Sequence, residues 1–248
     1  GYKMVEKYSP EDWRKALEDD KNFEQEKPFD YDLCVNLLEE CAKDIDNLNP
    51  YLLFRPIWEI TKGFRSISTA LSVGFSDITS KVDVWRSIFK NHYSDLNTVQ
   101  EVIEKEITMG IHILNGENNK DKGHKKKTRY YEYTSGSRTL LRLTWFLDFF
   151  SNICKNVVEL KDKSFADCIR MAYDKALAPH HPWLVRQGAA IGISFAPSKK
   201  EKGMYFFHGR ESFDSEIQAR MERWRVVTSK LREYLHKLYT DKKLLDLP

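Results

Sequence analysis

The sequence lacks several features that would point to common classes of protein. No apolar run approaches the ~18 residues of a membrane-spanning helix, so we expect no segment to cross a bilayer, and no secretory signal precedes the first predicted helix. There is no HExxH or cysteine-based metal site, no glycine-rich phosphate loop and no GxSxG nucleophile motif. We therefore expect neither a metal ion nor a cofactor.

An excess of one charge is also missing. The chain carries 40 basic and 37 acidic residues, a net charge of +3, which is too even to indicate a nucleic-acid partner. The four cysteines form no CxxC pair and are expected to be reduced thiols inside helices, which fits the cytosol. Because 41% of its 248 residues are hydrophobic, the chain can bury a large core.

Apolar residues recur at helical spacing along most of the chain and strand signals are scarce, so the fold is expected to be all-α. Helices are predicted at about 30–45 (with Asp30 as N-cap), 51–71 (interrupted near Pro56), 76–92, 97–114, 138–157, 164–177, briefly from 183, and 214–239. Residues 1–27 are interpreted as an N-terminal extension with room for one short helix around Trp13–Leu17. Residues 28–248 are interpreted as one domain.

Two segments between the predicted helices lose all periodicity. Residues 115–133 form an exposed basic loop that contains Lys125, Lys126 and Lys127, and residues 197–213 form a polar linker. The lysine run is most simply a solvated loop, and the alternative is attraction to an anionic membrane surface.

Two pairs of charged residues stand out on otherwise apolar helices. Asp77 and Lys81 are four residues apart and share one helix face, as a surface ion pair would. Arg138 and Arg142 have the same spacing, although like charges one turn apart repel each other. They are either two solvated arginines or a pair that faces an anion such as phosphate, which the positive end of the helix would also attract.

The third polar feature is His181, which follows a second histidine and precedes Pro182 and Trp183. Neighbouring histidines rarely face one metal ion, so His181 is more simply a hydrogen-bonding group. Trp183 is either a core residue or an interfacial anchor of the kind that membranes favour.

The segments Asp77–Lys81, Ser137–Leu143, His181–Arg186 and Leu244–Pro248, in this order, resemble the glycolipid transfer protein superfamily. The resemblance extends over residues 30–248 and is closest to the ceramide-1-phosphate transfer branch. It implies a two-layer, all-α sandwich that encloses a pocket for lipid chains. Walls for that pocket are expected from Leu140, Leu141, Trp145, Phe149, Val82, Trp85 and Phe89, which are otherwise ordinary core residues.

The resemblance also implies roles for the polar residues. Asp77 matches the aspartate that accepts a hydrogen bond from the ceramide amide, and His181 matches the histidine that donates to the ceramide carbonyl. Lys81 and Arg142 stand where glycolipid-binding members have asparagine and a sugar-stacking tryptophan, so a phosphate headgroup is expected. Arg138 matches a further phosphate-binding arginine.

Trp183 matches a tryptophan that touches the membrane surface in this family. The resemblance therefore implies a cytoplasmic, monomeric carrier that associates peripherally with membranes and transfers ceramide-1-phosphate without enzymatic chemistry. A lipid sensor of the same fold and a glycolipid carrier remain open alternatives. A phosphoester hydrolase using Asp77 and His181 is disfavoured because the hydrolase motifs are absent.

Three features depart from the family pattern. The loop 116–129 and the linker 198–212 are longer than the usual connections, and Trp145 stands where the phosphate branch favours a basic residue. Arg129 belongs to the long loop and is a further candidate for contact with phosphate.

Overall fold

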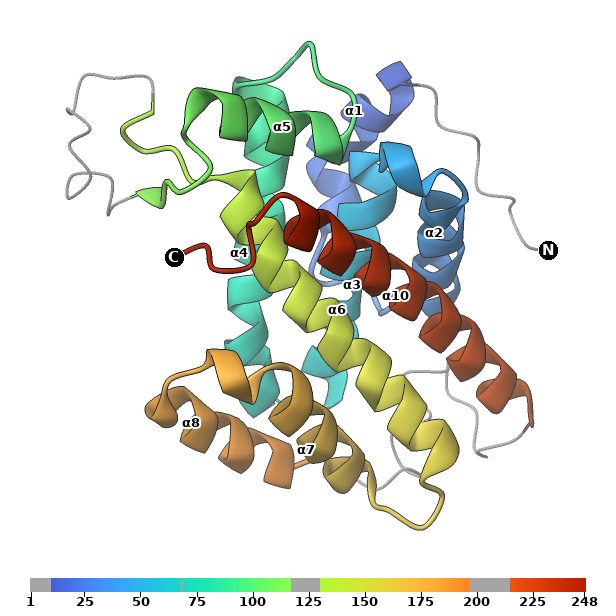
Figure 1. Cartoon of the computed structure of the whole chain (residues 1–248). Coiled ribbons are helices and arrows are strands. Elements are labelled where there is room, and N and C mark those ends of the chain that lie inside the picture. Colours follow the sequence, from blue (N-terminus) through green and yellow to red (C-terminus); the bar gives the residue numbers. More distant parts are fainter. Residues whose placement is uncertain (1–9, 68, 117–129, 197–214) are drawn as a thin grey trace.

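The computed structural model describes residues 10–67, 69–116, 130–196 and 215–248 (Figure 1). The lysine run at 125–127, Arg129 and the linker 198–212 lie outside these ranges. The helices are α1 (Pro10–Glu18), η1 (Asp20–Phe23), α2 (Tyr31–Lys43), η2 (Ile45–Asn47), α3 (Pro50–Ile67), α4 (Thr69–Asn91), α5 (Val99–Met109), α6 (Gly136–Glu159), α7 (Phe165–Ala176), η4 (Ala178–His180), α8 (Trp183–Ser194) and α10 (Ser215–Asp241).

The described helices form two layers, which confirms the predicted all-α sandwich. In Figure 1, α6 crosses the front with α10 on one side and α7 on the other, while α3 and α4 pack together behind them. α2 contacts both α3 and α10 and closes the side of the sandwich. Among the described residues there is no strand, apart from an isolated bridge between Asn115 and Thr134. No described helix has both the length and the hydropathy of a membrane span.

Side-chain caps explain where several helices begin. Asp30 accepts a hydrogen bond from the Leu33 amide, which confirms it as the N-cap of α2. Thr98 and Glu101 form a reciprocal capping box at the start of α5. Ser135 caps α6, so this helix begins at Gly136, two residues before the predicted start at 138.

The predicted interruption near Pro56 is wrong, because α3 runs without a break through this residue. Proline removes one backbone hydrogen bond at a cost of about 3 kcal/mol. Phe54, Ile57 and Trp58 on both sides of Pro56 are almost fully buried, and their packing offsets that cost. The Cys34 thiol of α2 also donates to the Pro56 carbonyl oxygen over 3.1 Å.

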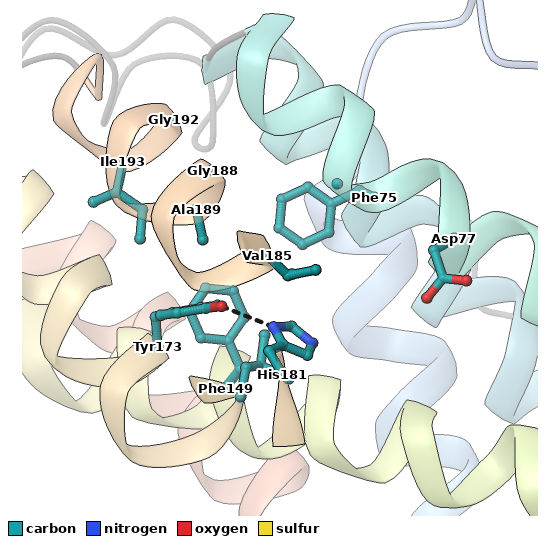
Figure 2. Close-up of a pocket in the computed structure, with 12 residues that line it drawn as sticks. Phe75, Asp77, Phe149, Tyr173, His181, Val185, Gly188, Ala189, Gly192 and Ile193 are labelled. Atoms are coloured by element: carbon teal, nitrogen blue, oxygen red, sulfur yellow. Dashed lines mark hydrogen bonds between the residues drawn. The ribbon is translucent and has the colours of Figure 1, made fainter. Parts of the chain in front are cut away.

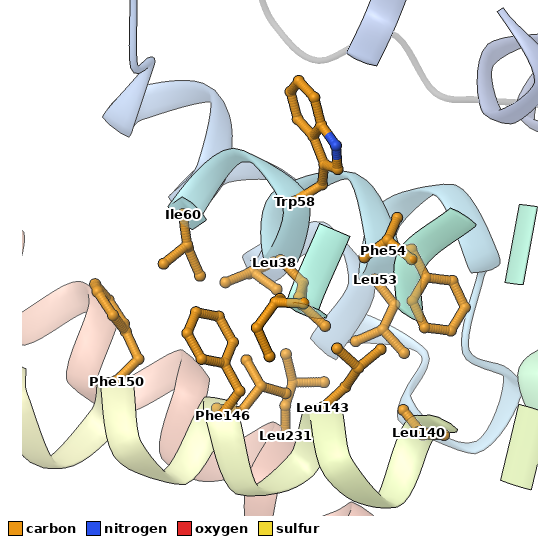
Figure 3. Close-up of a cluster of buried hydrophobic side chains, with 14 of the residues drawn as sticks. Leu38, Leu53, Phe54, Trp58, Ile60, Leu140, Leu143, Phe146, Phe150 and Leu231 are labelled. Carbon is orange, nitrogen blue, oxygen red and sulfur yellow. The ribbon is translucent and has the colours of Figure 1, made fainter. Parts of the chain in front are cut away.

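The core lies between the layers, where α2 and α3 meet α6 and α10 (Figure 3). Leu53 from α3 faces Leu143 from α6, Ile60 from α3 faces Phe146 from α6, and all four side chains are fully buried. The four cysteines are free thiols buried in α2, α6 and α7, as predicted. Burial raises the pKa of Cys41 to about 12, so this thiol stays protonated and unreactive.

Residues 10–23, which the sequence sets apart within the N-terminal extension, contribute to the same core. The short helix predicted around Trp13–Leu17 exists as α1, and both of these side chains are buried. Trp13 meets Phe89 of α4 edge to face, with ring centroids 5.3 Å apart. α1 therefore packs directly against the layer that contains α4.

Close packing of α4 on α6 depends on Gly136. A Cβ atom at this position would lie 2.7 Å from Cζ2 of Trp85, which is closer than carbon atoms approach each other. Trp85 is fully buried and stacks on Phe54 with ring centroids 4.7 Å apart. The first residue of α6 is therefore a glycine because a tryptophan of α4 occupies the space beside it.

Candidate functional site

A mostly apolar cavity of about 570 Å³ lies where α4, α7 and α8 meet (Figure 2). Phe75 of α4, Phe149 of α6 and Val185 and Ile193 of α8 supply apolar walls. Gly188 of α8 also lines the cavity, and a Cβ atom there would meet no atom within 4 Å. Asp77, His181 and Tyr173 are the titratable residues among its walls.

Asp77 and Lys81 lie one turn apart on α4, at the edge of this cavity. Their side chains form an ion pair over 2.5 Å, in which the Asp77 side chain is 69% exposed and that of Lys81 only 16%. The predicted pairing is therefore present. The exposed carboxylate keeps one side open to further hydrogen-bond donors.

Arg138 and Arg142 occupy the first two turns of α6. Burial, together with the nearby charge of Arg142, lowers the pKa of Arg138 to about 10. Arg138 donates through Nε to the Pro248 carbonyl oxygen, and Arg142 donates to the Arg138 carbonyl oxygen over 3.1 Å. Neither arginine forms an ion pair with a carboxylate in the described part of the chain, which is unusual for partly buried guanidinium groups.

Asp77, Lys81, Arg142 and His181 are close enough to interact electrostatically, and Arg138 is near Arg142. Burial lowers the pKa of Arg142, and the nearby charge of Asp77 opposes this shift. Burial also lowers the pKa of His181. The charges of His180 and Lys81 lower it too, whereas that of Asp77 raises it. Two distant stretches of chain, on α4 and α6, therefore meet beside His181 at the mouth of the cavity.

The positive end of α6 does not serve this site, contrary to the expectation that it would attract an anion. Glu106 of α5 is fully buried and accepts hydrogen bonds from the amides of Gly136 (2.6 Å) and Ser137 (2.9 Å) and from two hydroxyls, those of Tyr133 (2.5 Å) and Ser137 (2.6 Å). Burial raises the pKa of Glu106, although the hydrogen bonds from these four donors act to lower it. An anion at this site would therefore meet arginine side chains rather than free amides of the helix end.

His181 follows the 3-10 helix η4 and points into the cavity (Figure 2). Its Nδ1 atom is hydrogen-bonded to the Tyr173 hydroxyl over 2.8 Å, and the other ring nitrogen faces the side on which Asp77 lies. His180 points elsewhere and stacks on Trp145, with ring centroids 3.7 Å apart and planes 2° apart. The Arg142 guanidinium carbon lies 5.5 Å from the centroid of the same Trp145 ring.

Sequence reasoning did not identify all of these contacts. Trp145 supports the site by contacting both His180 and Arg142, although its position seemed to speak against the phosphate branch. Tyr173 was missed because its partner lies eight residues further on, across a helix end. Of the seven predicted pocket walls, only Phe149 lines the cavity. Val82, Trp85, Phe89, Leu140 and Leu141 are packed in the core, and Trp145 stacks on His180.

α8 presents large apolar side chains to solvent beside the cavity. Trp183 is 64% exposed and Leu184 74% exposed, and Ile191 and Phe195 are exposed to a similar degree. Arg186 is the one charged residue of this helix. We call the exposed side chains of Trp183, Leu184, Val185 and Ile191, together with Phe195 directly after the last residue of the helix, the apolar face of α8. It is the largest gathering of exposed apolar residues within one described helix.

The fold and site define an all-α protein with an apolar cavity whose mouth carries clustered cations. The sequence profile described as Glycolipid transfer protein (GLTP) matches residues 53–203, well over half of the chain. The chain therefore belongs to the glycolipid transfer protein family.

Individual relatives are similar to this chain in sequence. A ceramide-1-phosphate transfer protein of Xenopus laevis is 24% identical over 192 residues, which cover 76% of this chain and 82% of the relative. An ACD11 homolog protein of Arabidopsis thaliana is 26% identical over 110 residues, or 44% of this chain and 46% of that protein.

Solved structures share the fold. Mouse ceramide-1-phosphate transfer protein without ligand matches with a TM-score of 0.75 at 18% identity, covering 89% of this chain and 100% of the other. The human protein in complex with 2:0 ceramide-1-phosphate matches with a TM-score of 0.74 at 17% identity, covering 90% and 100%. HET-C2, a fungal glycolipid transfer protein, matches with a TM-score of 0.61 at 18% identity, covering 80% and 89%.

Proposed function

We propose that this protein binds a sphingolipid with a phosphate headgroup, ceramide-1-phosphate, and carries it from one membrane to another. The observation that supports this most is the composition of the cavity mouth. The three cations Lys81, Arg138 and Arg142 and the single carboxylate of Asp77 leave two positive charges. A phosphate monoester carries about −1.5 to −2 at pH 7, so the charges are complementary.

The ceramide amide group is assigned to Asp77 and His181. Asp77 is largely exposed and would accept a hydrogen bond from the amide N–H. If the Tyr173 hydroxyl donates to Nδ1 of His181, the proton of the neutral ring resides on Nε2 and is available to the ceramide carbonyl. Burial lowers the pKa of His181, which favours this neutral ring at pH 7. An unpaired amide leaving water would cost a few kcal/mol, so both contacts favour extraction.

The lipid chains need an apolar site that matches the bilayer. Each buried CH₂ group contributes about 0.8 kcal/mol to membrane affinity, so a chain of ~16 carbons is held by roughly 10 kcal/mol or more. A cavity of about 570 Å³ lined by Phe75, Phe149 and Ile193 offers comparable surroundings within the protein. Nothing in this scheme breaks a covalent bond, and the family is one of lipid-transfer proteins.

Membrane contact is assigned to the apolar face of α8, with Trp183 as an interfacial anchor. We further propose that the protein acts as a monomer from the cytosolic side and binds membranes only transiently. Replacing Leu184 with asparagine is expected to weaken vesicle binding at least fivefold. The matched control is Val226→Asn, which changes a 56% exposed valine of α10 and should leave binding unchanged. Equal loss in both variants would contradict the assignment to α8.

The decisive experiment is transfer between vesicles by the purified protein, combined with mass spectrometry of lipid that co-purifies with it. We expect ceramide-1-phosphate to be transferred and galactosylceramide to be neither transferred nor an effective competitor. Arg142→Leu should abolish transfer and leave the helical circular dichroism intact. Arg170→Leu, which removes an exposed arginine of α7, is the control for loss of charge.

Two other results would replace this proposal. Preferential transfer of galactosylceramide would make the protein a glycolipid carrier, the function named for the fungal relative of the same fold. Binding of ceramide-1-phosphate without turnover between vesicles would make it a lipid sensor.

A further inference from the structure

A second hollow, of about 220 Å³, lies between α6, α7 and α10 and shares no lining residue with the apolar cavity. In Figure 1, α6 passes between the other two helices. Every side chain that lines this hollow is polar or charged. It is smaller than the ~300–1,000 Å³ of pockets for drug-sized ligands, and an alkyl chain would find no apolar wall in it. Its size and lining suit a small polar group.

Four cations and one carboxylate line the hollow, and Glu222 and Glu233 outside its lining pair with Arg225 and Arg232. Lys155 comes from α6, Lys175 from α7, and Arg225 and Arg232 from α10. The carboxylate is Asp148, which is 3.3 Å from Nε of Arg232 and also accepts a hydrogen bond from the Asn152 amide over 3.1 Å. Asp148 is therefore already engaged by its neighbours.

The remaining cations differ in their partners. Arg225 is paired with Glu222, one turn earlier on α10, over 2.5 Å. Lys155 and Lys175 form no ion pair with any carboxylate in the ranges that the structure describes. Two lysines from different helices thus line one hollow without an ion-pair partner among the described residues, and a bound anion would reduce their mutual repulsion.

The base of the hollow provides neutral hydrogen-bonding groups. The hydroxyls of Ser151 on α6 and Ser229 on α10 lie 2.8 Å apart, and Ser151 is only 6% exposed. A hydroxyl pair shares one hydrogen internally and leaves the other free to donate. Lysine and arginine cations around hydroxyl donors are the chemistry that recognises phosphate oxygens.

We propose that this hollow, the α6–α7–α10 site, binds a phosphate group and is separate from the lipid headgroup site. The proposal does not depend on the proposed function. The phosphate belongs either to a soluble phosphorylated molecule or to the headgroup of an anionic membrane lipid. In both cases Lys155 and Lys175 supply the charge that is not already paired.

The test uses the full-length protein with inositol 1,4,5-trisphosphate as the soluble probe. Binding is measured by calorimetry at constant ionic strength and is located by amide chemical shifts. We expect shifts at residues 151–155 and 225–232 in wild type, and at least tenfold weaker binding in the double variant K155Q/K175Q. The control K161Q/K163Q removes two exposed lysines of the α6–α7 connection and should bind as wild type does.

Other outcomes would overturn the proposal. Equal affinities of wild type and K155Q/K175Q for the probe would do so, as would equal losses of affinity in both double variants. Loss of the chemical-shift changes in Arg142→Leu would assign the probe to the headgroup site. Vesicles with and without phosphatidylinositol 4,5-bisphosphate identify the source. Vesicle binding that depends on Lys155 and Lys175, without binding of the soluble probe, supports a lipid headgroup, and binding of both supports a free phosphate. Binding of neither overturns the site.

Discussion

The two ends of the sandwich use apolar residues in opposite ways. Where α3 meets α6, Phe54, Leu143 and Phe146 are fully buried in the core (Figure 3). Where α8 meets α4 and α7, the chain leaves a cavity and exposes Leu184 and Phe195 to solvent. Burial stabilises the first region. Exposure in the second does not stabilise the fold, which is consistent with the membrane contact proposed above.

The largest effect is expected in the packed region. Phe146→Ala should lower the free energy of unfolding by about 3–5 kcal/mol, since it removes a fully buried ring and leaves a void. Urea denaturation measures this change. The control Phe195→Ala removes an exposed ring of α8 and should change stability by no more than about 0.5 kcal/mol. Similar losses in both variants would show that the two ends do not differ as described.

The next effect concerns the buried carboxylate at the start of α6. Glu106→Gln is expected to lower the free energy of unfolding by about 2–3 kcal/mol. The carboxylate accepts hydrogen bonds from four donors at its two oxygens, whereas a glutamine side chain has one accepting oxygen and a donating NH₂ group. Thermal and urea unfolding measure the loss. Glu104→Gln, which changes an exposed glutamate paired with Lys242, is the control and should be nearly neutral. A neutral Glu106→Gln would remove this role.

A smaller change in stability with a large change in function is expected at the cavity. Gly188→Leu should fit without strain, since no atom lies within 4 Å of a Cβ there, and the added side chain should fill the cavity. Transfer is expected to fall at least tenfold, with unfolding changed by less than about 1 kcal/mol. Ala190→Leu, on the neighbouring exposed position of α8, is the control. Full transfer by Gly188→Leu would mean that lipid chains do not enter here.

The smallest effect is a dependence of stability on pH. Burial lowers the pKa values of His180 and His181 below their ordinary value of about 6.5. The unfolded chain therefore takes up protons first as the pH falls, and stability should decrease from pH 7 downwards through this window. Urea denaturation between pH 7 and pH 5 measures the slope. His181→Gln should reduce it more than His236→Gln, and equal slopes would contradict the assignment.

Much of the fold follows from the sequence because helical periodicity is a local property. Side-chain caps set the first residues of α2, α5, α6 and α7. Asp30 and Ser135, for example, each accept a hydrogen bond from the amide three residues later in the sequence. The path of α3 through Pro56 was not predictable, since it depends on packing by distant helices. The position of the cavity was equally hidden. Val82 and Trp85 have the same apolar character as Phe149, and only the three-dimensional arrangement separates core from wall.

The sequence predicted the residues of the candidate site but not their surroundings, and the binding roles of these residues stay a prediction. Motif resemblance identified Asp77, Lys81, Arg142 and His181, which the fold brings together. It did not reveal that the carboxylate of Glu106 already accepts hydrogen bonds from the amides at the N-terminus of α6. Such a contact joins residues about 30 positions apart and leaves no periodic trace in the sequence.

The close approach of Trp85 to Gly136 also affects the distance between α4 and α6. Asp77 and Lys81 are carried by the same helix as the indole, and the arginines by the helix that the glycine begins. A single methyl group at position 136 would act as a wedge between the two cation-bearing helices. Under the proposed function, the distance between the proposed headgroup residues of α4 and α6 therefore depends on a position outside that set.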